Sequence, residues 1–153
     1  NDRRGTWSQV RATLVKSARF PDHDQDQGQH QWNFRIVPDA SVLEAVAAGQ
    51  QINLGEREVS GAPVDAPFSV SGAVVESVAL APDRSGELVV RLYEAEGGPS
   101  RVTFRAPKAG SVTACDLRYR PSESEPELRG GQGEWSFDLS AFQITTLRVS
   151  FAK

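Results

Sequence analysis

The sequence contains no methionine, one cysteine and two histidines among its 153 residues. With Cys115 alone, the chain cannot form an internal disulfide, and it cannot build a zinc site based on cysteine. We expect Cys115 to be a buried, unreactive thiol in a strand, which fits a reducing compartment and a cytoplasmic location. Because the chain opens at Asn1 and lacks methionine, we expect it to be a piece of a longer polypeptide whose targeting signal, if any, lies upstream.

An excess of one charge and a long apolar run are also missing. The 17 lysines and arginines nearly balance the 20 aspartates and glutamates, for a net charge of -3. Nucleic-acid-binding domains carry a basic patch, so nucleic acid is not expected as a partner. Residues 61–73 carry a single charge, but this stretch is short and contains two prolines. A membrane is therefore not expected as a partner either.

Segments typical of β-strands recur after residue 73 at the spacing of roughly 8–12 residues that characterises β-sandwiches. Leu88–Tyr93 is apolar or aromatic except for Arg91 and is followed by the turn sequence Gly97-Gly98-Pro99, so we expect a central strand covered on both faces. Three further strands carry inward-facing triplets, namely Val102/Phe104/Ala106, Trp135/Phe137/Leu139 and Leu147/Val149/Phe151. The expected strands are 74–80, 88–93, 101–106, 112–117, 134–139 and 145–151, and a mobile loop over 118–133 re-enters the sheet at 130–133.

The first half of the chain predicts fewer elements. Apolar and polar residues alternate over 10–17 and 31–37, which predicts two strands, the second with Trp32, Phe34 and Ile36 on one face. Ser41 and Glu44 have the spacing of a capping box, and Gly49 can end the helix, so we expect one helix of about two turns. Residues 52–72 are rich in glycine and proline and predict an extended connector with a short strand near 68–70. The fold class is therefore all-β, an antiparallel immunoglobulin-like sandwich with extra N-terminal strands and one short helix.

Two patterns resemble metal sites. Asp22, Asp24 and Asp26 alternate ahead of Gly28, but this glycine stands one position too late for an EF-hand, and Asn33 stands where the glutamate is needed. His23 and His30 lack the spacing of zinc ligands and have no thiolate partner. We therefore interpret the segment as a solvated or interdomain loop, and we assign no metal ligand to the chain.

The sequence gives equally little indication of a catalytic site. Glycosidases need two carboxylates about 5–9.5 Å apart in a concave site, and nothing in the sequence brings such a pair together. We interpret the four candidates as surface charges at strand ends; they are Glu94, Glu96, Asp116 and Asp138. The tryptophans could form a sugar-stacking platform, yet Trp32 and Trp135 share the alternation of apolar neighbours and are expected in cores, whereas Trp7 precedes its strand and is less decided.

Several segments resemble the C-terminal β-sandwich of the glycoside hydrolase family 38 α-mannosidases. The similar segments are Glu76-Ser-Val-Ala-Leu-Ala, Asp83–Gly86, Arg91-Leu-Tyr-Glu-Ala-Glu-Gly-Gly, Phe142-Gln-Ile-Thr-Thr-Leu-Arg-Val and, upstream, the stretch from Lys16 to His30. They follow the family's order and spacing and cover most of the chain. The resemblance implies that residues 1–60 are the last strands and short helix of a larger sandwich, 61–72 a connector, and 73–153 the small terminal sandwich.

The resemblance also implies a function for the parent polypeptide. Family 38 enzymes hydrolyse terminal α-mannosides with retention, using an aspartate nucleophile and a zinc ion held by Asp and His residues of an N-terminal catalytic domain. This chain lacks that domain, so we carry over no catalytic or metal residue, and we expect no cofactor in the chain itself. The expected partners are the catalytic domain and, through it, the α-mannoside substrate.

The stretch from Lys16 to His30 matches the family segment expected at the pocket rim or at the contact with the catalytic domain. The residues concerned are Lys16, Ser17, Arg19, Asp22, His23, Asp24, Asp26 and His30. Lys16 and Ala18 replace an arginine and a proline of the family pattern, and the opening segment Asn1–Gly5 lacks a tyrosine of that pattern.

Two alternatives from other classes stay open, a carbohydrate-binding module and an immunoglobulin-like spacer or adhesion domain. An exposed aromatic row would favour the first, and a closed sandwich without an apolar flank the second. A piece severed from a large enzyme should expose strand edges and apolar surface. We expect such a piece either to pair its N-terminal strands with the small sandwich or to self-associate.

Overall fold

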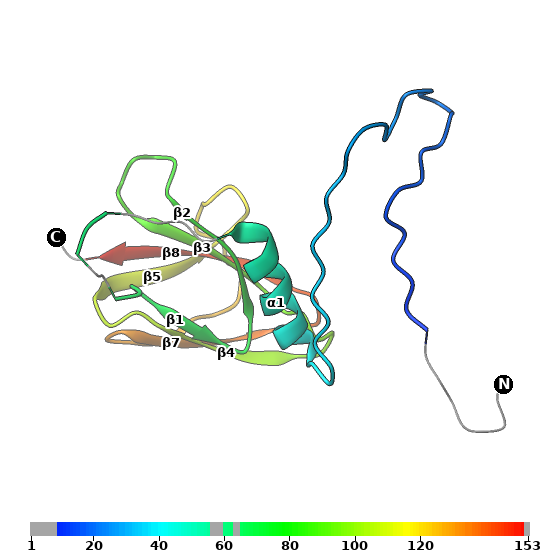
Figure 1. Ribbon diagram of the computed structural model, residues 1–153. Coiled ribbons are helices and arrows are strands. Elements are labelled where there is room, and N and C mark those ends of the chain that lie inside the picture. Colours follow the sequence, from blue (N-terminus) through cyan, green and yellow to red (C-terminus); the bar gives the residue numbers. More distant parts are fainter. Residues whose placement is uncertain (1–8, 56–59, 63–64, 152–153) are drawn as a thin grey trace, which may run out of the picture. The chain divides into compact units, whose positions relative to one another are not determined.

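The computed structural model describes residues 9–55, 60–62 and 65–151, and the chain divides into two compact units, Asn1–Ile36 and Val37–Lys153. The second unit is a β-sandwich of two four-stranded sheets, which are stacked face to face in Figure 1. All strand pairs are antiparallel. The all-β sandwich predicted from the sequence is thereby confirmed.

Each sheet joins strands that are distant in the sequence. One sheet has the order β1-β4-β7-β6 and the other β2-β3-β8-β5. The strands of the first sheet are β1 (Ser69–Ser71), β4 (Ser100–Arg105), β7 (Glu134–Leu139) and β6 (Arg129–Gly131). Those of the second are β2 (Val74–Leu80), β3 (Leu88–Tyr93), β8 (Ile144–Phe151) and β5 (Ala109–Cys115). β3 lies between β2 and β8, so the expected central position of Leu88–Tyr93 is confirmed.

The core lies between the two sheets and is built from the inward positions of the alternating strands. Of the three predicted triplets, all residues are buried except Phe151, which is partly buried and packs against the core. Ladder pairs place core residues opposite each other, as with Val102 and Phe137 or Val90 and Leu147. The period-two pattern therefore identified the core of the sandwich.

The four edge strands of the sandwich are either short or interrupted by a register shift. β1 and β6, the edges of the first sheet, are three residues long. β2 and β5, the edges of the second, are seven residues long, and each contains a register shift, between Val75 and Ser77 in β2 and between Ala109 and Ser111 in β5. Short and bulged edge strands are poor templates for pairing with a further strand.

Helix α1 (Val42–Leu54) begins where predicted but runs longer. The Ser41 hydroxyl accepts a hydrogen bond from the Glu44 amide, and the Glu44 carboxylate accepts one from the Ser41 amide at 2.8 Å, which is the expected capping box. The predicted end at Gly49 is wrong, because Gly49 keeps a helical conformation and accepts a hydrogen bond from the Asn53 side chain at 2.8 Å. Gly55, with φ of 60°, ends the helix instead. No described helix is long and apolar enough to cross a membrane.

The predicted strands over 10–17 and 31–37 are wrong. Residues 9–36 contain no helix or strand, and both sheets of the described chain begin only at Ser69. Both segments have the alternation of strands, but a strand forms only when a second segment supplies the ladder of hydrogen bonds, and the described chain offers none.

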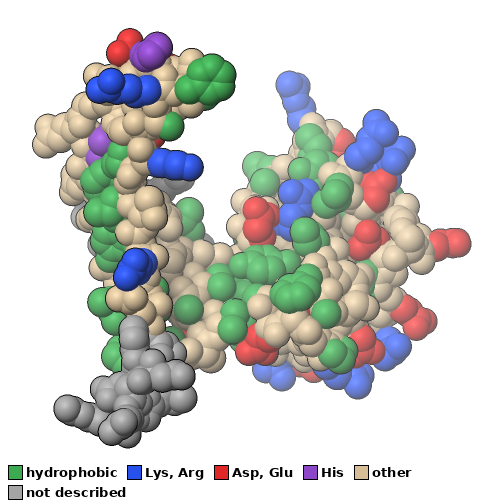
Figure 2. Space-filling view, turned by 90° about the vertical axis from the view of Figure 1, so that its right-hand side faces the viewer, with side chains coloured by type: hydrophobic (Ala, Val, Ile, Leu, Met, Phe, Trp, Pro, Cys, Tyr) green, Lys and Arg blue, Asp and Glu red, His purple; other side chains and the backbone are tan. Residues whose placement is uncertain are grey.

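The aromatic face predicted for the second segment is also exposed rather than buried. Trp32, Phe34 and Ile36 are 42%, 64% and 90% exposed. Figure 2 shows hydrophobic side chains at the surface of this unit over much of its described length. Trp7 lies outside the described residues.

Candidate functional site

The stretch from Lys16 to His30 forms a compact loop in the first unit. The Ser17 hydroxyl donates to the carbonyl oxygen of Asp26 at 3.4 Å, and His30 Nε2 lies 2.9 Å from the same oxygen. A carbonyl oxygen can only accept, so His30 donates through Nε2 and carries its proton there. Both Ser17 and Asp26 have positive φ, at 39° and 58°. The two ends of the loop are therefore joined at one carbonyl group.

A hollow of about 410 Å³ opens beside this junction. It is lined by Thr13, Leu14, Val15, Lys16, Asp26, His30 and Trp32. Three of the eight predicted site residues, Lys16, Asp26 and His30, meet here, and Ser17 adjoins them through its hydrogen bond to Asp26. The other four do not line the hollow; they are Arg19, Asp22, His23 and Asp24.

Four residues that line this hollow were not predicted as site residues, namely Thr13, Leu14, Val15 and Trp32. The ring of Trp32 is stacked on that of His30, with centroids 5.3 Å apart and planes inclined by 24°. The spacing of two residues between His30 and Trp32 would have shown that both lie on one side of an extended chain. An ammonium group, a carboxylate and an exposed aromatic pair are groups that can bind a polar ligand with an apolar face.

The alternating aspartates of the loop do not converge on a common point. Asp22 Oδ1 accepts from the Asp24 amide at 2.9 Å, and the Asp24 carbonyl accepts from the Gln27 amide at 3.4 Å, which are turn contacts. Within residues 9–55, 60–62 and 65–151, no three His, Cys, Asp or Glu side chains are grouped as metal ligands.

Two of the four carboxylates considered as catalytic candidates, Asp116 and Asp138, have partners that give them structural roles. Asp116 accepts from the amides of Arg118 and Arg120 at 2.8 and 3.0 Å, which closes the turn after β5. Asp138 pairs with Arg129 across β7 and β6 at 3.1 Å. Asp116 and Asp138 thus belong to different elements, and each is engaged in a structural contact.

Glu94 corrects the interpretation of these carboxylates as surface charges, because it is only 3% exposed. Its carboxylate accepts from the amides of Glu96 at 2.6 Å, Gly97 at 2.9 Å and Phe142 at 2.9 Å. The amide of Phe142, and then those of Glu96 and Gly97, lower the pKa of Glu94 against the opposing effect of burial. Glu94 therefore joins the loop after β3 to the turn before β8.

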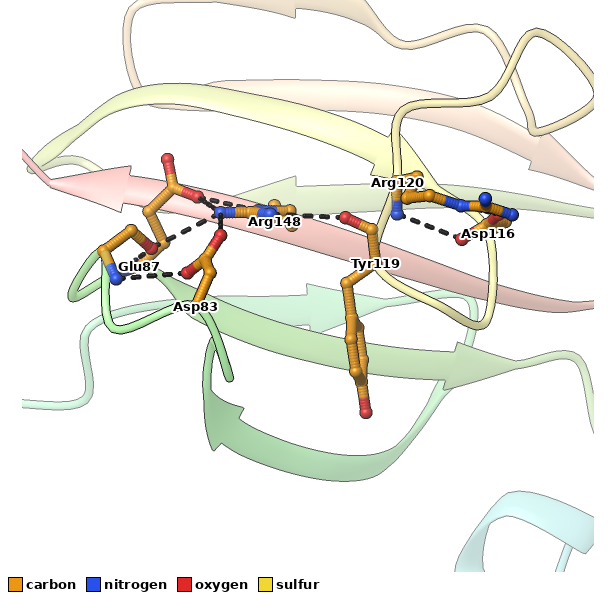
Figure 3. Close-up of polar contacts among 7 residues, drawn as sticks. Asp83, Glu87, Asp116, Tyr119, Arg120 and Arg148 are labelled. Atoms are coloured by element: carbon orange, nitrogen blue, oxygen red, sulfur yellow. Dashed lines mark hydrogen bonds and ion pairs between the residues drawn. The ribbon is translucent and has the colours of Figure 1, made fainter.

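Arg148 is the centre of a polar cluster in the sandwich unit (Figure 3). It donates from Nη2 to Asp83 at 2.7 Å and from Nε to Glu87 at 2.7 Å, and Nη2 also contacts Glu87. Nη1 donates to the carbonyl oxygen of Tyr119 at 3.3 Å. Hydrogen bonds from Ser85 and Arg148 lower the pKa of Asp83 to about 2. Every nitrogen of the guanidinium group is thus engaged in holding the turns after β2 and β5 against β8.

Cys115 is buried, as predicted, and its thiol donates to the carbonyl oxygen of Thr146 at 3.3 Å. Burial raises the pKa of the Cys115 thiol to about 11. The thiolate, which is the reactive form, is therefore scarce at neutral pH. Cys115 is a structural residue.

Comparison with protein families found a match, which lies in the sandwich unit. A family model described as "Glycosyl hydrolases family 38 C-terminal beta sandwich domain" matches residues 72–147. The matched region runs from the glycine before β2 into β8 and includes Glu94 and nearly all of the Arg148 cluster, though Arg148 itself lies one position beyond it. A comparison with curated proteins found no match. Residues 72–147 are thus similar to the C-terminal beta sandwich domain of glycosyl hydrolase family 38.

Proposed function

We propose that this chain is the C-terminal β region of a zinc-dependent, retaining α-mannosidase, and that it packs on and completes the catalytic domain of its own polypeptide. The family match over residues 72–147 carries this proposal. The structural contacts of Glu94, Asp116 and Asp138 support it, since each of these carboxylates is engaged by backbone amides or by an arginine. The catalytic aspartate and the zinc ion belong, in this proposal, to the catalytic domain.

The loop from Lys16 to His30 is the proposed contact with the catalytic domain or the rim of its pocket. Lys16 and Asp26 supply opposite charges around the hollow, and the stacked rings of His30 and Trp32 supply an apolar surface. Such a mixture is typical of interfaces between domains of one chain, which are more polar than obligate interfaces. We also propose a cytoplasmic location, supported by the single cysteine.

The test is complementation of the two parts of the enzyme. The catalytic polypeptide that precedes this chain is co-expressed with it or expressed alone, supplied with zinc, and assayed for hydrolysis of an aryl α-mannoside. We expect activity only when both parts are present. Full activity of the catalytic polypeptide alone, without association, would contradict the proposal.

A carbohydrate-binding module is a second candidate, and the exposed pair of His30 and Trp32 favours it. Sugars commonly stack on exposed aromatic rings beside hydrogen-bonding side chains. This candidate predicts that the chain alone binds yeast mannan in affinity electrophoresis, and that Trp32→Ala abolishes the retardation while Trp135→Phe, a substitution in the core, leaves it unchanged. Equal mobility with and without mannan would exclude this candidate.

A further inference from the structure

One end of the sandwich carries an aromatic residue in an unusual conformation. Phe142, in the turn before β8, has φ of 58° and a side chain that is 70% exposed. A positive φ is uncommon for a bulky residue, and an exposed phenylalanine gains little from burial in its own domain. Such strain persists only where the surrounding structure holds it in place, and it is frequent at functional sites.

The surrounding structure holds Phe142 by a buried charge. Glu94 Oε2 accepts from the amides of both Phe142 and Gly97 at 2.9 Å, and Oε1 accepts from the amide of Glu96 at 2.6 Å. A buried carboxylate that lost one of these donors would be left partly unsatisfied, which is costly. The backbone of Phe142 is therefore fixed to the loop after β3.

The ring of Phe142 is also fixed. A Cβ atom added to Gly97 would lie 2.8 Å from the Cζ atom of Phe142 and within 3.5 Å of both Cε atoms. The far end of the ring thus lies directly on the backbone of Gly97, whose φ of 79° already favours glycine. The ring therefore packs against the backbone of Gly97 on one side, while most of the side chain is exposed.

A second exposed apolar residue adjoins this turn. Ile144 begins β8, is 54% exposed, and is paired in the ladder with the partly buried Tyr93. The oxygens of Glu94, the carboxylate nearest in the structure to the Phe142 backbone, are already engaged by amides. The exposed Glu96 lies in the loop that holds Phe142. Two exposed apolar side chains with a charged neighbour match a protein interface, which has an apolar centre and a polar rim.

We propose that Phe142 is an anchor residue that inserts into an apolar pocket on the catalytic domain of the parent enzyme, with Ile144 beside it at the same contact. This inference rests on the proposed function, which supplies that partner. Rigid, exposed aromatic residues are the usual centres of binding energy in interfaces, because little conformational entropy is lost when they are buried. All residues of the contact and its support lie within the region matched by the family 38 domain.

The test uses the full chain, co-expressed with the catalytic polypeptide and purified as a complex. Phe142→Asn removes the ring but tolerates a positive φ, and Phe142→Gly removes both the ring and the strain. Leu117→Asn is the matched control, because Leu117 is 65% exposed in a different turn. The dissociation constant of each complex is measured by dilution and size-exclusion chromatography, and the melting temperature of each isolated chain by circular dichroism.

We expect both Phe142 variants to raise the dissociation constant at least tenfold. Their melting temperatures should stay within a few degrees of that of the unchanged chain. The Leu117 variant should bind with the same dissociation constant as the unchanged chain. Equal affinity of the Phe142 variants and the unchanged chain would overturn the inference and leave the proposed function standing. Equal weakening by the Leu117 variant would overturn it as well, because the contact would then not be specific. If the unchanged chain fails to associate, both the inference and the proposed function fall.

Discussion

At the scale of single residues, the most consequential side chain of the sandwich is a carboxylate that is hidden from solvent. Glu94 is held between two loops by three backbone amides, and these contacts lower its pKa. The ionised form is thus favoured by folding. The stabilisation is fully present above the ordinary pKa of 4.5 and is lost as the pH falls through the lower pKa of the folded state.

We expect Glu94→Gln to lower the melting temperature by several degrees at pH 7, because a side-chain amide cannot accept from all three donors through two equivalent oxygens. The difference between the variant and the unchanged chain should shrink as the pH is lowered from 5 to 2. Differential scanning calorimetry over this range measures both effects, and Glu96→Gln, at an exposed neighbour, is the control. A constant difference at all pH values would show that ionisation of Glu94 does not stabilise the fold.

The Cys115 thiol should be inert in the folded chain. With its pKa raised to about 11 and its sulfur buried, we expect no reaction with Ellman's reagent at pH 8 within minutes, and full reaction after unfolding in guanidinium chloride. The raised pKa also predicts that stability declines as the pH rises from about 8.5, the ordinary value for an unfolded thiol, through about 11. Rapid labelling of one thiol in the native chain would contradict this assignment.

The burial of single residues could be predicted from the sequence only where the local strand pattern determines it. Where burial depends on a distant segment of the chain, the prediction failed. Cys115 lies on a regular strand, so its burial could be inferred from its place among alternating residues. Glu94 follows a strand and is buried by loops that come from elsewhere in the chain, and no local pattern records this contact. Trp32 has the alternation of a core residue but lies in a segment without a partner strand.

At the scale of elements, the helix and the strands depend on different partners. The start of α1 was predicted correctly because a capping box involves residues three positions apart, whereas its end was not, because nothing local prevents Gly49 from remaining helical. The inner strands β3, β4, β7 and β8 were predicted because each has a buried face, and their partners are also in the chain. The two N-terminal segments show that alternation alone does not make a strand.

The capping box should stabilise α1 more than it stabilises the whole domain. No residue of α1 is buried, and one described tie to the sheet is the hydrogen bond from the Gln50 side chain to the Val75 carbonyl at 3.1 Å. We expect Ser41→Ala to destabilise the helix by about 1 kcal/mol and to increase amide hydrogen exchange in α1, with little change in β3 or β8. Ser41→Asp should retain the slow exchange, and a uniform increase across the sandwich would contradict the local role of the cap.

At the scale of the whole molecule, the division after Ile36 predicts that the second unit is a folding unit in its own right. Every buried hydrophobic residue in the described part of the chain lies between Val74 and Val149. We expect a chain of residues 37–153 to unfold in a single cooperative transition, with a melting temperature within a few degrees of that of the full chain. Calorimetry of both chains makes the comparison, and a broad or missing transition in the shorter chain would show that residues 1–36 complete the core.

The edges of the two sheets influence whether this protein forms ordered aggregates at high concentration. Growth of ordered aggregates proceeds by the addition of strands to an open edge, and the edges of the sandwich are either three residues long or interrupted by a register shift. Residues 9–36 have no such protection and expose Val10, Phe20, Phe34 and Ile36. We therefore expect any ordered aggregation of the chain to begin in residues 9–36 rather than at the edges of the sandwich.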